Sequence, residues 1–191
     1  MCKVVEPRQM EFNTTRLAPL LDALCVAYQS KGIEVSESLQ PALTEAEIRQ
    51  HIEGAKLQAS SDILELYGWR NGSVEGSTLP LGFVGKAFVP LDRAMTERHL
   101  MLTALGRDGE DGLESMLFPF AVGDGGWYAV EAGNDNSPVY LVVEVAELHF
   151  ESVEAMVKTC VEWIAEPDWS LTERPARAQA IWYKHNPSVD E

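Results

Sequence analysis

Two β-forming runs around a short turn-forming cluster limit most strongly what this chain can fold into. The runs are Trp127–Ala132 and Val139–Val145, and the cluster between them reads Gly-Asn-Asp-Asn. Aromatic and β-branched residues favour strands, whereas Gly, Asn and Asp favour turns, so the stretch predicts an antiparallel hairpin. The apolar run Met116–Val122 predicts a third strand, which a Gly-Asp-Gly-Gly sequence at 123–126 ends.

Helical patterns lie on both sides of these strands. Apolar residues recur at helical spacing from Leu17 to Tyr28, and a Thr-x-x-Glu capping box starts a second helix at Thr44. A third helix is predicted to end at Asn71-Gly72, with the glycine in the left-handed conformation that closes many helices. Further elements are a strand within 83–91 and helices at 92–105, 152–166 and 172–183.

The order of these elements predicts the fold class. Helices come first, strands with one interposed helix follow, and a helix closes the region, which is typical of an α+β protein rather than of alternating βαβ units. We expect a mixed, mainly antiparallel sheet from residues 79–145, covered on one face by the helices near 44–57, 61–71 and 152–166. With 191 residues, 46% of them hydrophobic, the chain can bury a substantial core. The side chains expected in that core are Leu66, Tyr67, Phe118, Phe120, Tyr140, Val142, Met156, Val157 and Ile164.

Acidic residues outnumber basic ones by 30 to 15, which gives a formal net charge of −15. Phosphate binding needs clustered Lys and Arg, so this charge argues against nucleic acid or an anionic membrane and for a basic protein partner. Most of the excess lies between Asp108 and Asp168, where fourteen Asp and Glu accompany one lysine, Lys158. The alternative is that the acidity only keeps the protein dispersed.

One lysine cannot neutralise all the carboxylates of this segment, so we expect unpaired acids to form a partner-binding face. Trp127, flanked by glycine at the start of a strand, is either an exposed anchor of that face or a packing residue of the sheet. The expected partner-binding residues are Asp108, Glu110, Asp111, Glu114, Asp124, Trp127, Glu131 and Asp135.

No catalytic or metal-binding pattern stands out in the sequence. His51, His99, His149 and His185 are far apart, the cysteines share no metal or redox spacing, and no serine lies in a Gly-x-Ser-x-Gly motif. The sequence therefore predicts a protein that is not an enzyme and that needs no cofactor or metal. The N-terminus has no leader-like pattern, and no run approaches the ~20 apolar residues of a membrane span, so a cytoplasmic location is expected.

Several short motifs, in one order, resemble the Smi/Knr-type SUKH superfamily. The segment 62–72, Asp-Ile-Leu-Glu-Leu-Tyr-Gly-Trp-Arg-Asn-Gly, is similar to the helix-plus-Asn-Gly signature of that superfamily. The segments that resemble the elements following this signature are Phe88–Leu91, Leu117–Phe120 with Gly123-Asp124, Pro138–Val145 and Ser152–Ile164. The resemblance covers residues 44–169 and implies a domain there. An N-terminal helical extension at 1–43 then precedes the domain, and a C-terminal tail at 170–191 packs on it.

Most members of this superfamily are bacterial immunity proteins, and fungal cell-wall regulators are among the relatives. The resemblance therefore implies that the chain binds and neutralises a cognate toxin, and the acidic composition suits a basic toxin such as a nuclease. A non-enzymatic regulatory or scaffold module with a cellular protein partner is the alternative. The superfamily has no catalytic residues to carry over to this chain.

Overall fold

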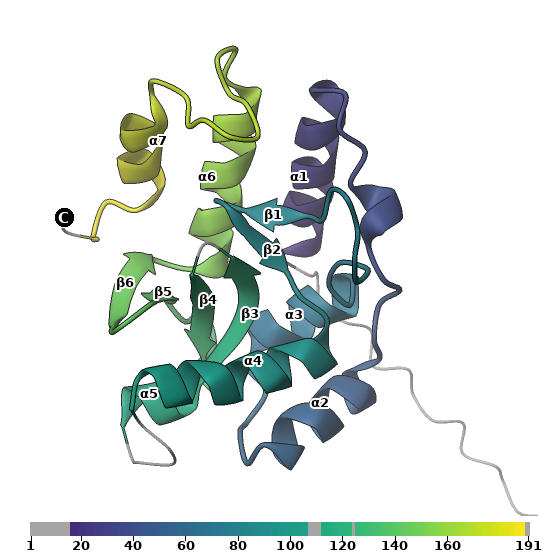
Figure 1. Ribbon diagram of the computed structural model, residues 1–191, viewed down its shortest axis with the longest axis vertical. Helices are drawn as coiled ribbons and strands as arrows, with labels where there is room; N and C mark the ends of the chain where they lie inside the picture. The colour runs from purple at the N-terminus through teal and green to yellow at the C-terminus, as the bar shows by residue number, and fades with distance from the viewer. Residues whose placement is uncertain (1–15, 107–111, 124, 190–191) are drawn as a thin grey trace, which may run out of the picture.

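Six strands form one sheet in which each strand pairs with its neighbour in the chain (Figure 1). This computed structural model describes residues 16–106, 112–123 and 125–189. The strands are β1 (Gly82–Phe83), β2 (Lys86–Phe88), β3 (Leu117–Gly123), β4 (Gly126–Glu131), β5 (Val139–Val142) and β6 (Ala146–Phe150). The α+β class is confirmed, and the sheet is antiparallel in all described pairings rather than mixed.

Helices surround this sheet within the described ranges. They are α1 (Ala18–Ser30), a 3-10 turn (Ser36–Ser38), α2 (Glu45–Gly54), α3 (Ser61–Trp69), α4 (Leu91–Ala104), α5 (Leu113–Met116), α6 (Val153–Ala165) and α7 (Ala178–His185). The predicted capping box forms at α2, where the Thr44 side chain accepts from Glu47 N and the Glu47 side chain accepts from Thr44 N. Ser152 caps α6 by accepting a hydrogen bond from Ala155 N (3.1 Å). Such caps satisfy backbone N–H groups that the helix itself leaves without partners.

The predicted hairpin forms as β4 and β5, with Ala129 opposite Tyr140. The second run ends earlier than expected, because the chain turns at Val143–Val145 and returns as β6. Strand β6 lies outside the predicted strands, although its sequence, Ala-Glu-Leu-His-Phe, has the apolar–polar alternation of a strand with one exposed face.

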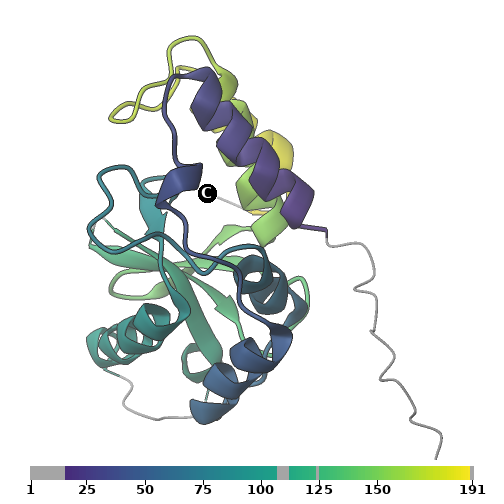
Figure 2. The ribbon, with the colours of Figure 1, turned by 90° about the vertical axis from the view of Figure 1, so that its right-hand side faces the viewer.

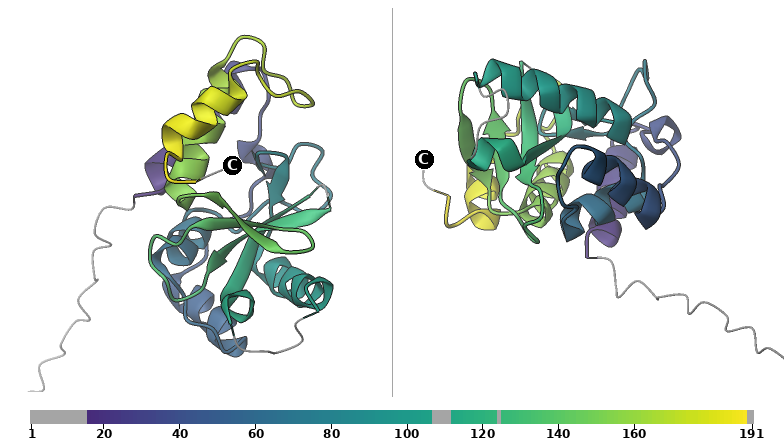
Figure 3. Two further views of the ribbon diagram at one scale, coloured as in Figure 1. Left: turned by 90° about the vertical axis from the view of Figure 1, so that its left-hand side faces the viewer. Right: turned by 90° about the horizontal axis from the view of Figure 1, so that it is seen from below.

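Alternate side chains of the sheet face two separate hydrophobic clusters. In β4, Tyr128 and Val130 face the main core, whereas Trp127 and Ala129 face a smaller cluster on the other side. Helix α4 supplies Met101 to the smaller cluster and covers part of this side of the sheet (Figure 3). The helices expected to cover one face, near 44–57, 61–71 and 152–166, all contribute to the main core. Helix α4 covers part of the other face in addition, and the prediction did not include this.

The main core packs α1, α2, α3 and α6, with the first turn of α4, against the other side of the sheet. Leu21 of α1, Ile52 of α2, Leu66 of α3 and Met156 of α6 are all fully shielded from solvent. Helix α1 lies alongside α6 (Figure 2), so the first described helix shares one core with the rest. Eight of the nine expected core residues are buried, and Tyr140 is partly buried against the smaller cluster.

The Asn71-Gly72 pair joins two segments instead of ending a helix. Helix α3 ends at Trp69, before the pair. The Asn71 side chain accepts a hydrogen bond from Leu91 N (2.9 Å), the first residue of α4. Gly72 (φ +68°) lies so close to the backbone of 89–90 that a Cβ would approach it to 2.3 Å. The predicted left-handed conformation of Gly72 is confirmed, but its role as the helix stop is wrong, since α3 ends two residues before the pair. The pair instead holds the start of α4 against the chain leaving α3.

Candidate protein-binding site

Strand β6 forms one edge of the sheet, and no described strand pairs with its outer side. An edge strand presents unpaired backbone N–H and C=O groups, to which another chain can add. In Figure 1, β6 lies at the left of the sheet, on the opposite side from α1 and α3. This edge is therefore a candidate surface for binding another protein.

The turn into β6 carries apolar side chains that cannot reach either hydrophobic cluster. The pairing of Val142 with Ala146 closes a tight hairpin, and Val143 N donates to Val145 O (3.2 Å). Val143, Val145 and Leu148 are 46%, 57% and 44% exposed. An exposed valine at a hairpin tip adds no buried apolar area to the folded protein. In a binding surface, the same side chain supplies apolar area that is removed from water on association.

Two carboxylates lie among these apolar residues. Glu144 is in the turn and Glu147 is on β6, and both are exposed. In the part of the chain that the structure describes, neither side chain makes a hydrogen bond or an ion pair. The resulting surface, here called the β5–β6 edge, combines apolar area with unneutralised negative charge. Its members are Val143, Glu144, Val145, Glu147 and Leu148.

Four of the eight residues expected to bind a partner are within the described part of the structure. Asp108, Glu110, Asp111 and Asp124 lie outside the described residues.

The others are spread over both ends of β4. Glu114 is half-buried on α5, and Glu131 ends β4 and accepts a hydrogen bond from the Asn134 side chain (2.8 Å). Trp127, at the start of β4, is half-buried against the smaller cluster, and its Nε1 donates to Glu97 (2.9 Å). The structure thus places Glu114 and Glu131 at one end of β4 and Trp127 at the other.

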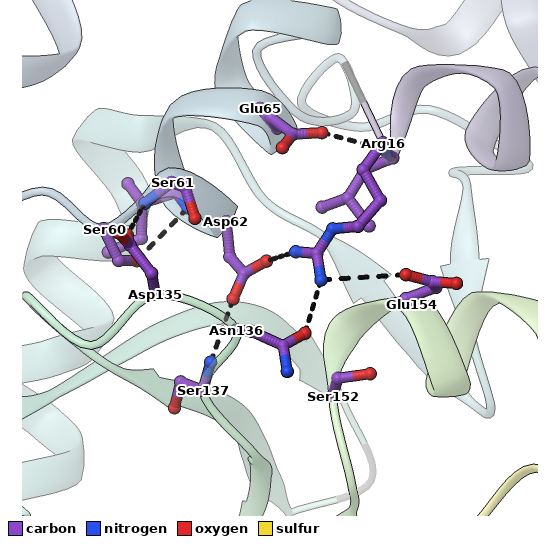
Figure 4. Close-up of polar contacts among 12 residues, drawn as sticks. Arg16, Ser60, Ser61, Asp62, Glu65, Asp135, Asn136, Ser137, Ser152 and Glu154 are labelled. Atoms are coloured by element: carbon purple, nitrogen blue, oxygen red, sulfur yellow. Dashed lines mark hydrogen bonds and ion pairs between the residues drawn. The ribbon is translucent and has the colours of Figure 1, made fainter. Parts of the chain in front are cut away.

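The remaining expected residue, Asp135, is exposed and lies beside a polar network built around a buried carboxylate (Figure 4). Asp135 accepts a hydrogen bond from Ser61 N (2.6 Å) at the start of α3. Beside it, the fully buried carboxylate of Asp62 pairs with Arg16 and accepts a hydrogen bond from Ser137 N (3.1 Å). Burial raises the pKa of Asp62 more than Arg16 and Ser137 lower it. The network fixes the β4–β5 turn to α3 and to the chain just before α1.

Several other carboxylates of the acidic segment have basic partners from outside that segment. Glu162 pairs with Lys184 (2.5 Å), and Glu166 pairs with Arg177 (3.1 Å). Both cations lie C-terminal to the segment in which charges were counted. Some acids of the segment do stay unpaired among the described residues, as expected, but fewer than a count of one lysine implies, because folding brings distant cations to them. What remains unpaired is concentrated on fewer residues, including those of the β5–β6 edge.

None of the residues of the β5–β6 edge is among those predicted to bind a partner. Its signal is the segment Val-Val-Glu-Val-Ala-Glu-Leu at 142–148, which places acids among apolar residues beside a strand end. The prediction treats Val139–Val145 as one strand, whereas β5 ends at Val142. The turn that follows exposes Val143 and Val145, which a continuous strand does not indicate.

Within the described residues, no three His, Cys, Asp or Glu side chains gather closely enough to hold a metal ion. Cys160 is buried, and burial raises the pKa of its thiol to about 12, so it stays protonated at neutral pH. No helix in the described ranges has both the length and the apolar character needed to cross a bilayer.

The sequence was also compared with known proteins. No model of a protein family matches the chain, and no curated protein matches it.

Proposed function

We propose that this chain is an immunity protein that binds a basic bacterial toxin and blocks it by occlusion, with the β5–β6 edge as the main contact surface. The observation that carries the proposal is the combination, on an unpaired sheet edge, of three exposed apolar residues with two carboxylates that have no described partner. The SUKH-like motifs of the sequence support the same class of protein.

Each part of this surface has a distinct task in the proposed mechanism. Glu144 and Glu147 attract a basic toxin and occupy the positions where it binds phosphate groups. The two valines and Leu148 supply area that is removed from water in the complex and slows dissociation. A toxin whose phosphate-binding surface is covered in this way cannot take up its own substrate.

The test is a binding measurement with the protein encoded by the gene next to its own. Association and dissociation rates are measured by biolayer interferometry at low and at moderate salt, for wild type and for the double variant Glu144→Gln, Glu147→Gln. Because exposed charges mainly set the encounter rate, we expect association to slow by about fivefold or more at low salt and less at moderate salt.

The matched control removes the same charge elsewhere. Glu37 and Glu53 are exposed, lie on the 3-10 turn and on α2, and have no described partner. The variant Glu37→Gln, Glu53→Gln should bind like wild type. Equal slowing in both variants would mean that only net charge matters, and the β5–β6 edge would be rejected as the site. A neighbouring product that binds but is not toxic would favour the regulatory or scaffold function instead.

A further inference from the structure

A pocket of about 400 Å³ lies between β6, α6 and α7. Its volume falls within the ~300–1,000 Å³ range typical of small-molecule sites. The pocket is lined by two alanines and by His149, Trp163, Arg174, Gln179 and Trp182. We call it the Arg174 pocket.

Two indoles give this pocket flat walls. Trp163 is held in place because its Nε1 donates to Ala178 O (2.9 Å). The Arg174 guanidinium lies over the Trp163 ring, with Cζ 5.4 Å from the ring centroid. Trp182 contributes the second indole and packs against His149, with ring centroids 6.1 Å apart. Flat, rigid walls of this kind suit a planar ligand.

The polar groups of the pocket are mainly donors without acceptors. Arg174 is exposed and has no carboxylate within ion-pair distance among the described residues. The Nε1 of Trp182 is shielded from solvent and has no described hydrogen-bond partner. The ring nitrogens of His149 likewise make no hydrogen bond in the ranges that the structure describes. A buried donor without an acceptor is costly unless a ligand supplies one.

The charge of the pocket is opposite to that of the protein. None of the described residues that line it is Asp or Glu, although the chain carries a formal net charge of −15. Lys86 adds positive charge nearby, since its Nζ lies over the Tyr128 ring (5.4 Å) and that ring stacks on His149 (5.6 Å). A cation kept free of carboxylates in so acidic a protein favours an anionic ligand.

We infer that the Arg174 pocket binds a small planar anion, of which an aromatic carboxylate is the simplest case. The carboxylate is recognised by the Arg174 guanidinium and the flat body by the indoles of Trp163 and Trp182. This site is independent of the proposed toxin binding, because no residue of the β5–β6 edge lines it.

The protonation of His149 agrees with this assignment. Burial, and then the charges of Arg174 and Lys86, lower the pKa of His149 to about 4, so the imidazole is neutral at pH 7. A bound carboxylate offsets both cations and raises this pKa. Binding therefore tightens as the pH falls from 7 towards 5.

The test uses two probes of nearly the same shape, 2-naphthoate and the uncharged 2-naphthamide. Each is titrated into the full-length protein while the indole N–H resonance of Trp182 and the ring resonances of His149 are followed by NMR. We expect 2-naphthoate to shift both sets of signals with a submillimolar dissociation constant, and 2-naphthamide to bind at least about tenfold more weakly, since a hydrogen bond to a charged group is lost.

Two variants and one control locate the contact. Arg174→Gln should weaken 2-naphthoate binding by about tenfold or more and leave 2-naphthamide unchanged. Trp182→Phe keeps the flat wall but removes the donor, and it should weaken both probes. Arg70→Gln is the matched control, because Arg70 also lies over a tryptophan ring, that of Trp69 at 5.7 Å, and lines no part of this pocket.

Three results would overturn the inference. The first is that no resonance of Trp182 or His149 shifts with up to 10 mM 2-naphthoate (roughly −3 kcal/mol of binding free energy). The second is that 2-naphthoate and 2-naphthamide bind with equal affinity. The third is that Arg174→Gln and Arg70→Gln weaken 2-naphthoate binding equally. Thermal unfolding of each variant is recorded alongside, so that loss of binding is not confused with loss of fold.

Discussion

At the scale of single residues, the buried Asp62 carboxylate depends on a cation that lies 46 positions earlier in the chain. Replacing Arg16 by Met leaves this carboxylate buried without its counter-charge. Breaking a buried pair on one side commonly costs ~3–5 kcal/mol, and because Arg16 is about one-third exposed we expect about 2–3 kcal/mol at pH 7.

The pH dependence of this loss has a definite sign. The pKa of Asp62 is already raised, and without Arg16 it rises further, so the variant favours the neutral acid. The destabilisation by Arg16→Met should therefore be largest at neutral pH and shrink as the pH falls. Urea unfolding at pH 7 and pH 4.5 measures it. Arg49→Met, which breaks an exposed pair with Glu45, serves as control and should cost less than about 0.5 kcal/mol at either pH.

His149 also makes the stability of the folded protein depend on pH. Its pKa is shifted in the opposite direction to that of Asp62, so it destabilises the fold as the pH falls. Its pKa is lowered from 6.5 to about 4 in the folded protein, so below pH 6.5 the unfolded chain binds more protons than the folded one. The folded state should therefore lose up to about 3 kcal/mol of stability between pH 6.5 and pH 4 from this residue alone. In His149→Gln that part of the pH dependence should vanish. A His149→Gln variant as acid-sensitive as wild type would contradict it.

At the scale of elements, the link between α3 and α4 rests on Gly72. Replacing it by alanine strains the left-handed backbone (φ +68°) and drives a Cβ into the backbone of 89–90. We expect Gly72→Ala to lower the free energy of unfolding by at least about 2 kcal/mol. Gly76→Ala separates the two causes, because Gly76 has nearly the same φ (+71°) but open space at its Cβ, and it should cost about 1 kcal/mol.

Elements with strong local signals were predictable from the sequence, and those set by tertiary packing were not. The α2 capping box and the Ser152 cap of α6 depend on residues a few positions apart, so the sequence pattern identifies them. The role of Asn71 depends on Leu91, which is 20 positions away. Likewise, α4 covers the second face of the sheet because Met101 meets Ala129 there, a contact that no local pattern contains.

At the scale of the whole molecule, α1 belongs to the same core as the sheet and α6. Leu21 is fully buried, so Leu21→Ala should cost about 3–4 kcal/mol, as for other buried leucines. Val26 on the same helix is 61% exposed, and Val26→Ala should change stability by less than about 0.5 kcal/mol. Both proteins should unfold in one transition by tryptophan fluorescence and circular dichroism. Two separate transitions would show that 1–43 is an independent extension.

The β5–β6 edge and the Arg174 pocket, like the fold, depend on tertiary packing that local sequence patterns do not contain. The acidity of the region around β4 and β5 is visible in the sequence, but which acids stay unpaired depends on cations such as Lys184 that folding brings in. The Arg174 pocket is even less predictable from the sequence than the β5–β6 edge. His149, Trp163 and Trp182 come from three elements, and none of the spacings between them is a recognisable motif.

The chain-order pairing of β1 to β6 has a kinetic consequence. Four of the five strand pairings close short loops, and the β2–β3 pairing closes a longer one that contains α4 and α5. Joining α1 to α6 closes a far longer loop, as the hydrogen bond from Lys31 Nζ to Glu166 O across 135 positions illustrates. Loop-closure entropy grows with loop length, so the sheet should form before α1 docks. Leu21→Ala should then leave the refolding rate nearly unchanged and speed unfolding by about 100-fold or more, which stopped-flow measurements resolve. Helix α1 would in that case be the last element to join and the first to leave.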